Sequence, residues 1–298
     1  IILIYIFLAA SCSITIVVIF KLFDRYSINR YQAIVFNYLV CVITGCVNLG
    51  EVPFERSMFS EAWFPIVIVL GLLFMGGFNL MGRTVEHFGV AITSVAQRMS
   101  LGLSASFAIL YYNEPYDILK IIGILLALSA VVFINIPNKK KQEANLEAAT
   151  EEKKLSKWLI LFPVSIFCVS ASIEILMQYL HTVHEMEPAV ESIVLFASAG
   201  IIGFVGLFFF REKIEFKNFI GGIVLGVPNY FAIYSLLNAL EEMDGSVVYS
   251  LSNITIVTGA ALVGYLIFKE RLSLLNMLGI LLSVTAIILI AISNMGTV

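Results

Sequence analysis

Ten apolar runs, each about twenty residues long, constrain this chain more than any other feature. A helix needs roughly 20 apolar residues to cross a hydrocarbon layer of about 30 Å. The runs lack the polar–apolar alternation of barrel strands, so we expect helices. They lie near residues 1–20, 31–49, 63–82, 89–112, 118–136, 158–180, 189–210, 218–240, 246–268 and 273–293. The sequence therefore predicts an all-α integral membrane protein with ten transmembrane helices.

Composition excludes several functional classes. Hydrophobic residues make up 60% of the 298 residues and charged residues only 13%, so a soluble core would leave nothing polar enough to face water. The net charge of −3, with 18 thinly spread Lys and Arg residues, offers no basic face for nucleic acid. Because the sequence contains no P-loop, no Gly-x-Ser-x-Gly motif and no phosphate-cradling glycine loop, we do not expect ATP-driven transport by this chain alone. We predict no cofactor and no catalytic residue.

The two halves of the chain repeat one another across a polar linker. The hydrophilic stretch 137–157 cannot bury a core, and it separates residues 1–136 from residues 158–293. A shift of 156 residues pairs the helical ends of the two halves without gaps. It matches Gly89 with Gly245, Ser94 with Ser250, Glu114 with Glu270, and 123–126 with 279–282. Since each half holds five helices, the second must cross the membrane in the opposite sense, which predicts two inverted five-helix repeats.

Loop charges agree with this inversion. Lys and Arg collect in short cytoplasmic loops of membrane proteins. The loops after odd-numbered helices hold fifteen of these residues, and those after even-numbered helices hold only Arg56 and Lys120. We therefore expect a cell inner membrane protein whose central linker is cytoplasmic and whose two termini lie outside.

The end of each repeat carries a turn motif, clearest at Glu270-Arg271-Leu272 followed by Gly279-Ile280-Leu281-Leu282. With this motif and its two five-helix repeats, the chain resembles the EamA-type drug/metabolite transporter superfamily. The resemblance implies a ten-helix transporter with a central cavity between the halves and with the fifth and tenth helices at the periphery. It implies no particular substrate, because the family moves amino acids, drugs and other small metabolites. In this chain Gln97-Arg98-Met99 replaces a proline often found midway along the fourth helix.

Two charged residues fall at membrane depth, where a charge costs several kcal/mol. Arg98 lies eight residues into the fourth run, roughly 12 Å from its cytoplasmic end. It would either bind a substrate carboxylate or phosphate, or bond structurally to carbonyls and hydroxyls. Glu174, on one stripe with Ser170 and Gln178, is either a proton carrier or a carboxyl hydrogen-bonded at a wet helix end. Because the depths of Arg98 and Glu174 differ by roughly 12 Å, we expect no direct ion pair between them.

Polar residues at matched repeat positions complete the predicted binding site. Inversion places such pairs symmetrically about the midplane, where a shared site would lie. The alternative is hydrogen bonding between helices, worth about 0.6–2 kcal/mol each. The predicted substrate-binding residues are Arg98, Gln97, Asn253, Asn79, Ser94, Ser250, Asn37 and Tyr230.

Other motifs predict structure rather than chemistry. The Gly222-x-x-x-Gly226 spacing predicts close helix packing, and Glu114 predicts a cap at a turn. His181 and His184 are predicted in a loop and do not match the order of zinc proteases, so we expect no metal site.

These observations together predict a secondary active transporter rather than an enzyme. Its cargo would be a small polar, anionic or zwitterionic metabolite such as an amino acid, moved by an exporter or a proton-linked carrier. The expected partners are this solute and the lipid bilayer, with monomer and homodimer both open. Two alternatives remain: a membrane-embedded lipid- or sugar-modifying enzyme, which would need clustered His, Asp or Cys, and a passive channel.

Overall fold

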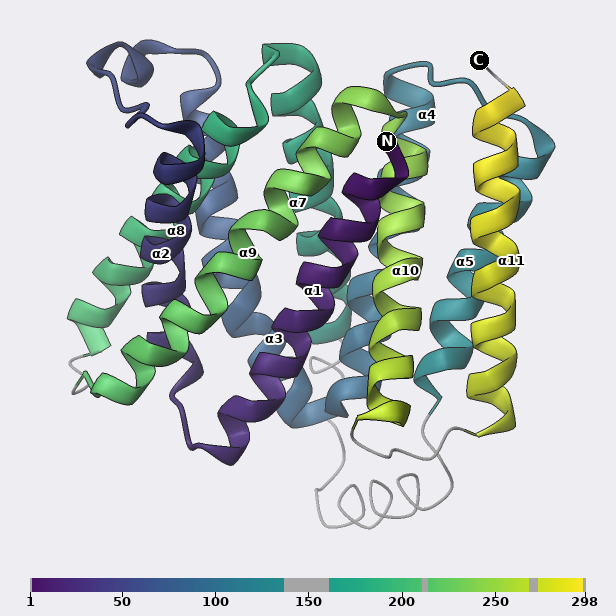
Figure 1. The fold of residues 1–298 in the computed structure, drawn as a ribbon, viewed down its shortest axis with the longest axis horizontal. Helices are drawn as coiled ribbons and strands as arrows, with labels where there is room; N and C mark the ends of the chain where they lie inside the picture. Colours follow the sequence, from purple (N-terminus) through teal and green to yellow (C-terminus); the bar gives the residue numbers. More distant parts are fainter. Residues whose placement is uncertain (1, 137–160, 211–213, 268–272, 297–298) are drawn as a thin grey trace. The chain divides into compact units, whose positions relative to one another are not determined.

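The computed structural model describes residues 2–136, 161–210, 214–267 and 273–296. Within these ranges the chain is helical and contains no strand, and nine helices are long and apolar enough to cross a membrane. The all-α class and the membrane-length helices are therefore confirmed. The helices are α1 (Ile2–Arg25), α2 (Arg30–Leu49), α3 (Phe64–Arg98), α4 (Ser100–Tyr111), α5 (Ile118–Asn135), α7 (Leu161–His184), α8 (Pro188–Phe210), α9 (Phe216–Glu242), α10 (Gly245–Leu266) and α11 (Leu274–Gly296), with a short 3₁₀ helix at Arg56–Ser60 (Figure 1).

Helix ends follow local signals in the sequence. The Asn29 side chain accepts a hydrogen bond from Gln32 N at the start of α2, as an N-cap residue does. At the other end of α2, Gly50 has a φ of 84°, and its N–H donates to Cys46 O. A left-handed residue of this kind ends a helix without the steric penalty of a Cβ.

The chain forms two compact units, and each takes helices from both halves of the sequence. Unit 1 comprises residues 1–77 and 175–243, and unit 2 comprises residues 78–174 and 244–298. The boundaries fall inside α3 and α7, so these two helices contribute to both units. Unit 1 thus contains α1, α2, α8 and α9, and unit 2 contains α4, α5, α10 and α11.

Unit 1 is built around the close packing of α9 on α2. A Cβ added at Gly222 would lie 2.5 Å from Phe36 Cβ and 2.8 Å from Ala33 O, and one added at Gly226 would lie 2.5 Å from Val40 Cβ. No larger residue fits at these contacts without moving the backbone. The predicted packing role of this glycine pair is confirmed.

Unit 2 contains an antiparallel pair, α5 and α11, which lie side by side (Figure 1). At one end of the pair, Ser293 Oγ donates to Asp117 Oδ1 over 2.6 Å. At the other end, Asn276 Nδ2 donates to main-chain carbonyls of residues 133, 134 and 136. The Ser293 hydroxyl, together with Lys120 N–H, lowers the pKa of Asp117, because both donors stabilise its carboxylate.

One predicted boundary is wrong. The sequence predicted separate helices near 63–82 and 89–112, but α3 continues through the intervening residues to Arg98. This segment contains polar residues and no proline, and Thr84 Oγ1 even bonds within the helix to Leu80 O. Polarity alone therefore did not end the helix. At 35 residues, α3 is roughly 52 Å long.

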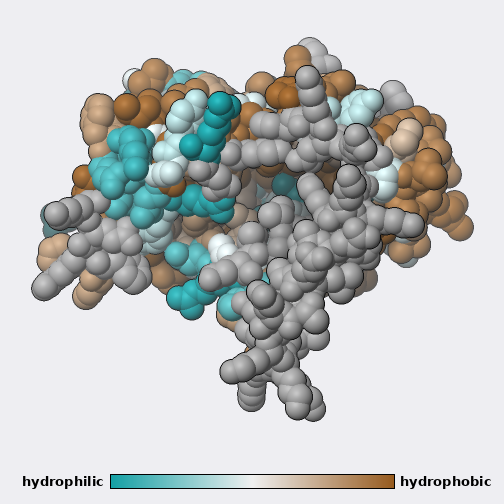
Figure 2. Space-filling view, turned by 90° about the horizontal axis from the view of Figure 1, so that it is seen from below, coloured by the Kyte–Doolittle hydropathy of each residue, from teal (hydrophilic) through white to brown (hydrophobic). Residues whose placement is uncertain are grey.

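Side chains outside the core fit a lipid environment. Large hydrophobic residues are exposed along the outward faces of the helices, including Phe7, Val47, Phe208 and Leu281. In the view of Figure 2, hydrophilic residues gather over one part of the face seen from below, next to exposed hydrophobic residues. Trp63 directly precedes α3, a position typical of a tryptophan at a membrane interface.

Candidate functional site

A polar cluster in unit 2 joins the end of α3 to α10, α7 and α4. Arg98 Nη1 donates to Asn253 Oδ1 over 2.8 Å, and Asn253 Nδ2 donates to Glu174 Oε1 over 3.1 Å. The hydroxyls of Ser100 and Ser104 also donate to the Glu174 carboxylate, over 3.2 and 2.6 Å. Four helices thus supply the side chains of one connected network.

The chain is interrupted at this cluster. The fourth apolar run, predicted as one helix, is divided at Met99 between the end of α3 and the start of α4. Ser104 Oγ bonds back to Ser100 O, a contact that often bends helices. The Ser100 side chain is directed to Glu174. The irregular backbone therefore lies next to the residues that hold the two charges.

Two further contacts position α10 in unit 2. Tyr249 Oη donates to the main-chain oxygen of Glu174 over 2.8 Å. At the start of α10, the Glu114 carboxylate accepts from Gly245 N over 2.8 Å and from Ser246 N over 3.0 Å. A negative charge is favourable at a helix N-terminus. The predicted capping role of Glu114 is confirmed, whereas Glu270 lies outside the described residues.

The two charges at the cluster are linked through an amide rather than paired directly. Among the described residues, Arg98 and Glu174 form no ion pair with each other, as the sequence predicted, and each bonds to Asn253. Both are half-buried. A guanidinium has five N–H donors. Of these, only one donates to a side chain in the described part of the protein, which leaves Arg98 with donors to offer a solute.

Three other predicted residues lie close to the cluster in the chain. Ser94 is one helical turn before Arg98 on α3, and Gln97 is its immediate neighbour; both are half-buried. Ser250, one turn before Asn253 on α10, is fully buried, and its Oγ has no hydrogen-bond partner among the described residues. These positions are compatible with a common polar face.

Asn79 does not lie in this cluster, although the sequence predicted it in the same site. It lies 19 residues before Arg98 on the same continuous helix, and a rise of 1.5 Å per residue separates them by roughly 28 Å. The Asn79 side chain is exposed. The expected proximity rested on a turn between two shorter helices, which would have brought both residues to similar depth; α3 has no such turn.

Asn37 and Tyr230, also predicted to bind substrate, lie in unit 1. Asn37 is buried, and its Oδ1 accepts from Asn229 Nδ2 over 3.2 Å. Tyr230 is fully buried, and its hydroxyl accepts from Asn48 Nδ2 over 3.1 Å. Both therefore hold α2 to α9, as polar side chains between membrane helices commonly do.

His181 and His184 were predicted in a loop, but they lie in the last turn of α7. His181 Nδ1 is 3.2 Å from Glu191 Oε2 on α8, and both side chains are buried. Sequence reasoning did not select Glu191. The available signal was a carboxyl one turn inside an apolar run, which is the same signal that selected Glu174.

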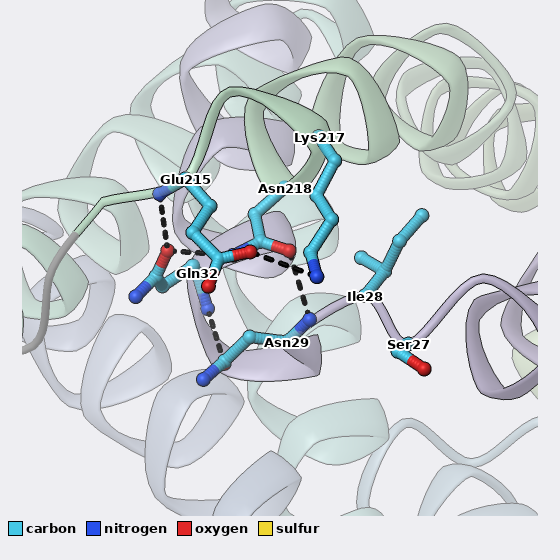
Figure 3. A pocket seen from close by; sticks show the side chains of 7 residues that line it. All are labelled: Ser27, Ile28, Asn29, Gln32, Glu215, Lys217 and Asn218. Atoms are coloured by element: carbon cyan, nitrogen blue, oxygen red, sulfur yellow. Dashed lines mark hydrogen bonds and ion pairs between the residues drawn. The ribbon is translucent and has the colours of Figure 1, made fainter.

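A separate polar cavity of about 430 Å³ lies in unit 1, where α2 and α9 begin. Figure 3 shows Gln32 and Asn218 pointing toward one another in its wall. Asn218 Nδ2 donates to Gln32 Oε1 over 2.8 Å, and Asn29 N donates to Asn218 Oδ1 over 2.9 Å. At its rim Lys217 pairs with Glu215. These mutual bonds make the cavity a capping arrangement at helix ends.

Metal-ligand geometry is not found in the described part of the chain, where no group of three or more His, Cys, Asp or Glu side chains is placed to hold an ion.

Comparison with known proteins finds a protein of similar sequence and a solved structure of similar fold. No family model matches the chain. A protein of Haemophilus influenzae, described as an uncharacterized protein, is 31% identical over 287 residues, and the alignment covers 94% of each chain. A solved structure titled "Crystal structure of protein" has a TM-score of 0.77 at 12% identity, covering 99% of this chain and 97% of that one. At that identity the likeness shows the fold alone.

Proposed function

We propose that this chain, which belongs to the same family as the Haemophilus influenzae protein, is a secondary transporter of a small anionic or zwitterionic metabolite such as an amino acid. The observation that carries the proposal is the network of Arg98, Asn253 and Glu174 within long apolar helices. Intramembrane charges are rare and mark substrate or ion pathways. The proposed mechanism is alternating access to this network from the two sides of the membrane.

The chemistry of the network suits a carboxylate-bearing solute. The planar guanidinium fork binds a carboxylate through two parallel hydrogen bonds, and Arg98 has spare donors for this. Glu174 offers a negative charge on the other side of Asn253, which would attract an ammonium group. A zwitterion would therefore satisfy both charges, whereas an anion would use Arg98 alone. Gln97, Ser94 and Ser250 are proposed to line the same site.

Reciprocal packing supports the inverted repeat on which alternating access rests. In unit 2, Gly123 approaches Ile290, and Gly279 approaches Ile134. A shift of 156 residues carries 123 to 279 and 134 to 290, so the two contacts exchange under the repeat. Such exchange of equivalent contacts is typical of a two-fold relation.

Loop charges support the proposed orientation, with the linker in the cytoplasm and both termini outside a bacterial-type inner membrane. Because α3 continues through Arg83, this residue no longer counts as a loop charge, and fourteen loop Lys and Arg residues remain on the proposed cytoplasmic side against two on the other.

The proposal is tested in two steps with purified protein. A thermal-shift screen of the common amino acids and simple carboxylates identifies a solute that raises the unfolding temperature, because a ligand that binds only the folded state stabilises it. Counterflow in proteoliposomes then separates a carrier, which accumulates labelled solute against unlabelled solute inside, from a channel or an enzyme.

Arg98→Ala provides the residue-level test, with Arg83→Ala as control because Arg83 is an exposed arginine on the same helix. Loss of a charged hydrogen bond worth about 1.5–3 kcal/mol should weaken solute binding roughly 10- to 150-fold. Arg98→Lys, which keeps the charge but not the fork, should lose part of this affinity. Unchanged counterflow by folded Arg98→Ala would refute the assigned role.

A further inference from the structure

A buried acid–base pair joins α7 to α8 in unit 1. His181 Nδ1 lies 3.2 Å from Glu191 Oε2, and the two side chains are 7% and 0% exposed. The second carboxyl oxygen of Glu191, Oε1, is buried and accepts no hydrogen bond from the described residues. The carboxyl thus has one partner, and that partner is itself titratable.

The basic residues of the neighbouring helices lie far from this pair. Gly45 of α2 packs against both Ile193 of α8 and Tyr230 of α9, which places the corresponding parts of the three helices together. Arg30 lies 15 residues before Gly45, roughly 22 Å along α2. Lys217 lies 13 residues before Tyr230, roughly 20 Å along α9. Neither cation reaches the Glu191 carboxyl.

The other ionisable side chains of the packed elements do not supply a cation either. The part of α3 in unit 1 has no ionisable residue, and α8 has only Glu191. The remaining groups on α2 and α9 near this level are thiols and phenols: Tyr38, Cys41, Cys46, Tyr230 and Tyr234. At the end of α7, Tyr179 contacts His184 edge-on, and the following loop adds the exposed acids Glu185 and Glu187.

Physical chemistry then favours a neutral pair. A buried carboxylate without a cation and with one unbonded oxygen is costly. With a proton on Oε2 donating to His181 Nδ1, Oε1 becomes a carbonyl oxygen, and a neutral atom of this kind tolerates the absence of a donor better than an anionic one. Separation into carboxylate and imidazolium would instead create two charges in an apolar environment.

We propose that Glu191 and His181 form a proton-binding site that holds one proton between the last turn of α7 and the first turn of α8. Loss of this proton leaves a buried anion and weakens the contact between the two turns. The site shares no residue with the network around Arg98. The proposal goes beyond the proposed function and does not depend on it, because its test measures proton binding and not transport.

Infrared spectroscopy of the full-length protein tests the proposal. At about pH 7, where free carboxyls are ionised, the carboxylic-acid C=O band of Glu191 should be present in the wild type and should shift in D₂O. The band should be lost in Glu191→Gln and retained in Glu187→Gln, a matched exposed control in the preceding loop. Identical wild-type and Glu191→Gln spectra in this region would overturn the proposal.

His181→Gln supplies an independent measurement where Glu191→Gln does not fold. Removal of the imidazole takes away the acceptor of the Glu191 proton, so the same band should move in frequency while remaining present near neutral pH. A band that keeps its wild-type frequency in His181→Gln would show that the proton is not shared with this histidine, and the proposed site would be wrong.

Discussion

The glycine contacts between α5 and α11 offer a sharp test, because two similar substitutions are expected to behave differently. A Cβ at Gly123 would lie 2.5 Å from Ile290 Cγ1 and 3.4 Å from Ala286 O. Since apolar carbons rest about 3.5–4.0 Å apart, the Ile290 side chain must move by about 1 Å. A Cβ at Gly279 would lie 2.7 Å from the main-chain nitrogen of Ile134. A backbone atom cannot rotate away, so here the helices must separate.

Overpacking of this kind costs about 1–3 kcal/mol of unfolding free energy. We expect Gly123→Ala at the lower end of this range and Gly279→Ala at the upper end. Ile290→Ala removes the obstructing Cγ1 and should relieve most of the cost of Gly123→Ala, with a coupling energy of about 1 kcal/mol. Ile134→Ala should not relieve Gly279→Ala, because the obstructing nitrogen remains.

Denaturant titration in mixed micelles, followed by circular dichroism, measures these free energies for the single and double variants. Gly76→Ala is the control, because a Cβ at Gly76 meets nothing within 4 Å. It should be neutral or stabilise the helix by up to about 1 kcal/mol. The packing argument would be refuted if Ile290→Ala and Ile134→Ala restored the unfolding free energy of their partner glycine variants equally. It would also be refuted if Gly123→Ala and Gly279→Ala lowered that free energy no more than Gly76→Ala does.

Three further predictions concern carboxyl groups. Glu174→Gln should abolish the pH dependence of counterflow and disturb the donors Ser100 and Ser104, and an unaltered pH profile would argue against proton coupling at this residue. Glu114→Gln should lower the unfolding free energy by about 1 kcal/mol, because an NH₂ donor replaces one of the two oxygens that accept N–H groups at the start of α10 and the negative charge is lost; thermal unfolding checks this. Asp117→Asn should destabilise the protein at neutral pH. Because folding lowers the pKa of Asp117, the stability it contributes is present above about pH 4 and is lost as pH falls through the folded value, so thermal unfolding curves of wild type and variant should converge in acid.

The helices themselves could be predicted because apolar run length and capping residues are local properties. Asn29 and Gly50 mark the ends of α2 in the sequence as they do in the structure. The continuation of α3 past Arg83 could not be read in this way, because a polar segment without proline is compatible with either a loop or a helix. The residues around Met99 include no proline that would have marked the interruption there.

The candidate site was predictable only in part, for a related reason. Arg98 and Glu174 were identified by the cost of a charge in an apolar run, and Asn253 by its repeat position. Their connection through one amide required the relative placement of three helices. Ser104, which makes the shortest bond to Glu174, was missed because a serine in an apolar helix carries no distinctive signal.

Positions related by the 156-residue shift show how the proposed repeats can share hydrogen-bonding roles with little sequence identity. Asp117 and Ser273 each cap a helix by accepting from the N–H three residues later, and those later residues are Lys120 and Asn276. Both Lys120 and Asn276 are buried. Lys120 Nζ donates to the Asp244 carboxylate, which calls for an ammonium group, whereas Asn276 Nδ2 donates to main-chain carbonyls, which a neutral amide satisfies. At each of these two positions the residue type matches the acceptor beside it, whereas the hydrogen-bonding role is set by the position in the repeat. Equivalent positions of the proposed inverted repeat are therefore better recognised by their hydrogen bonds than by identical residues.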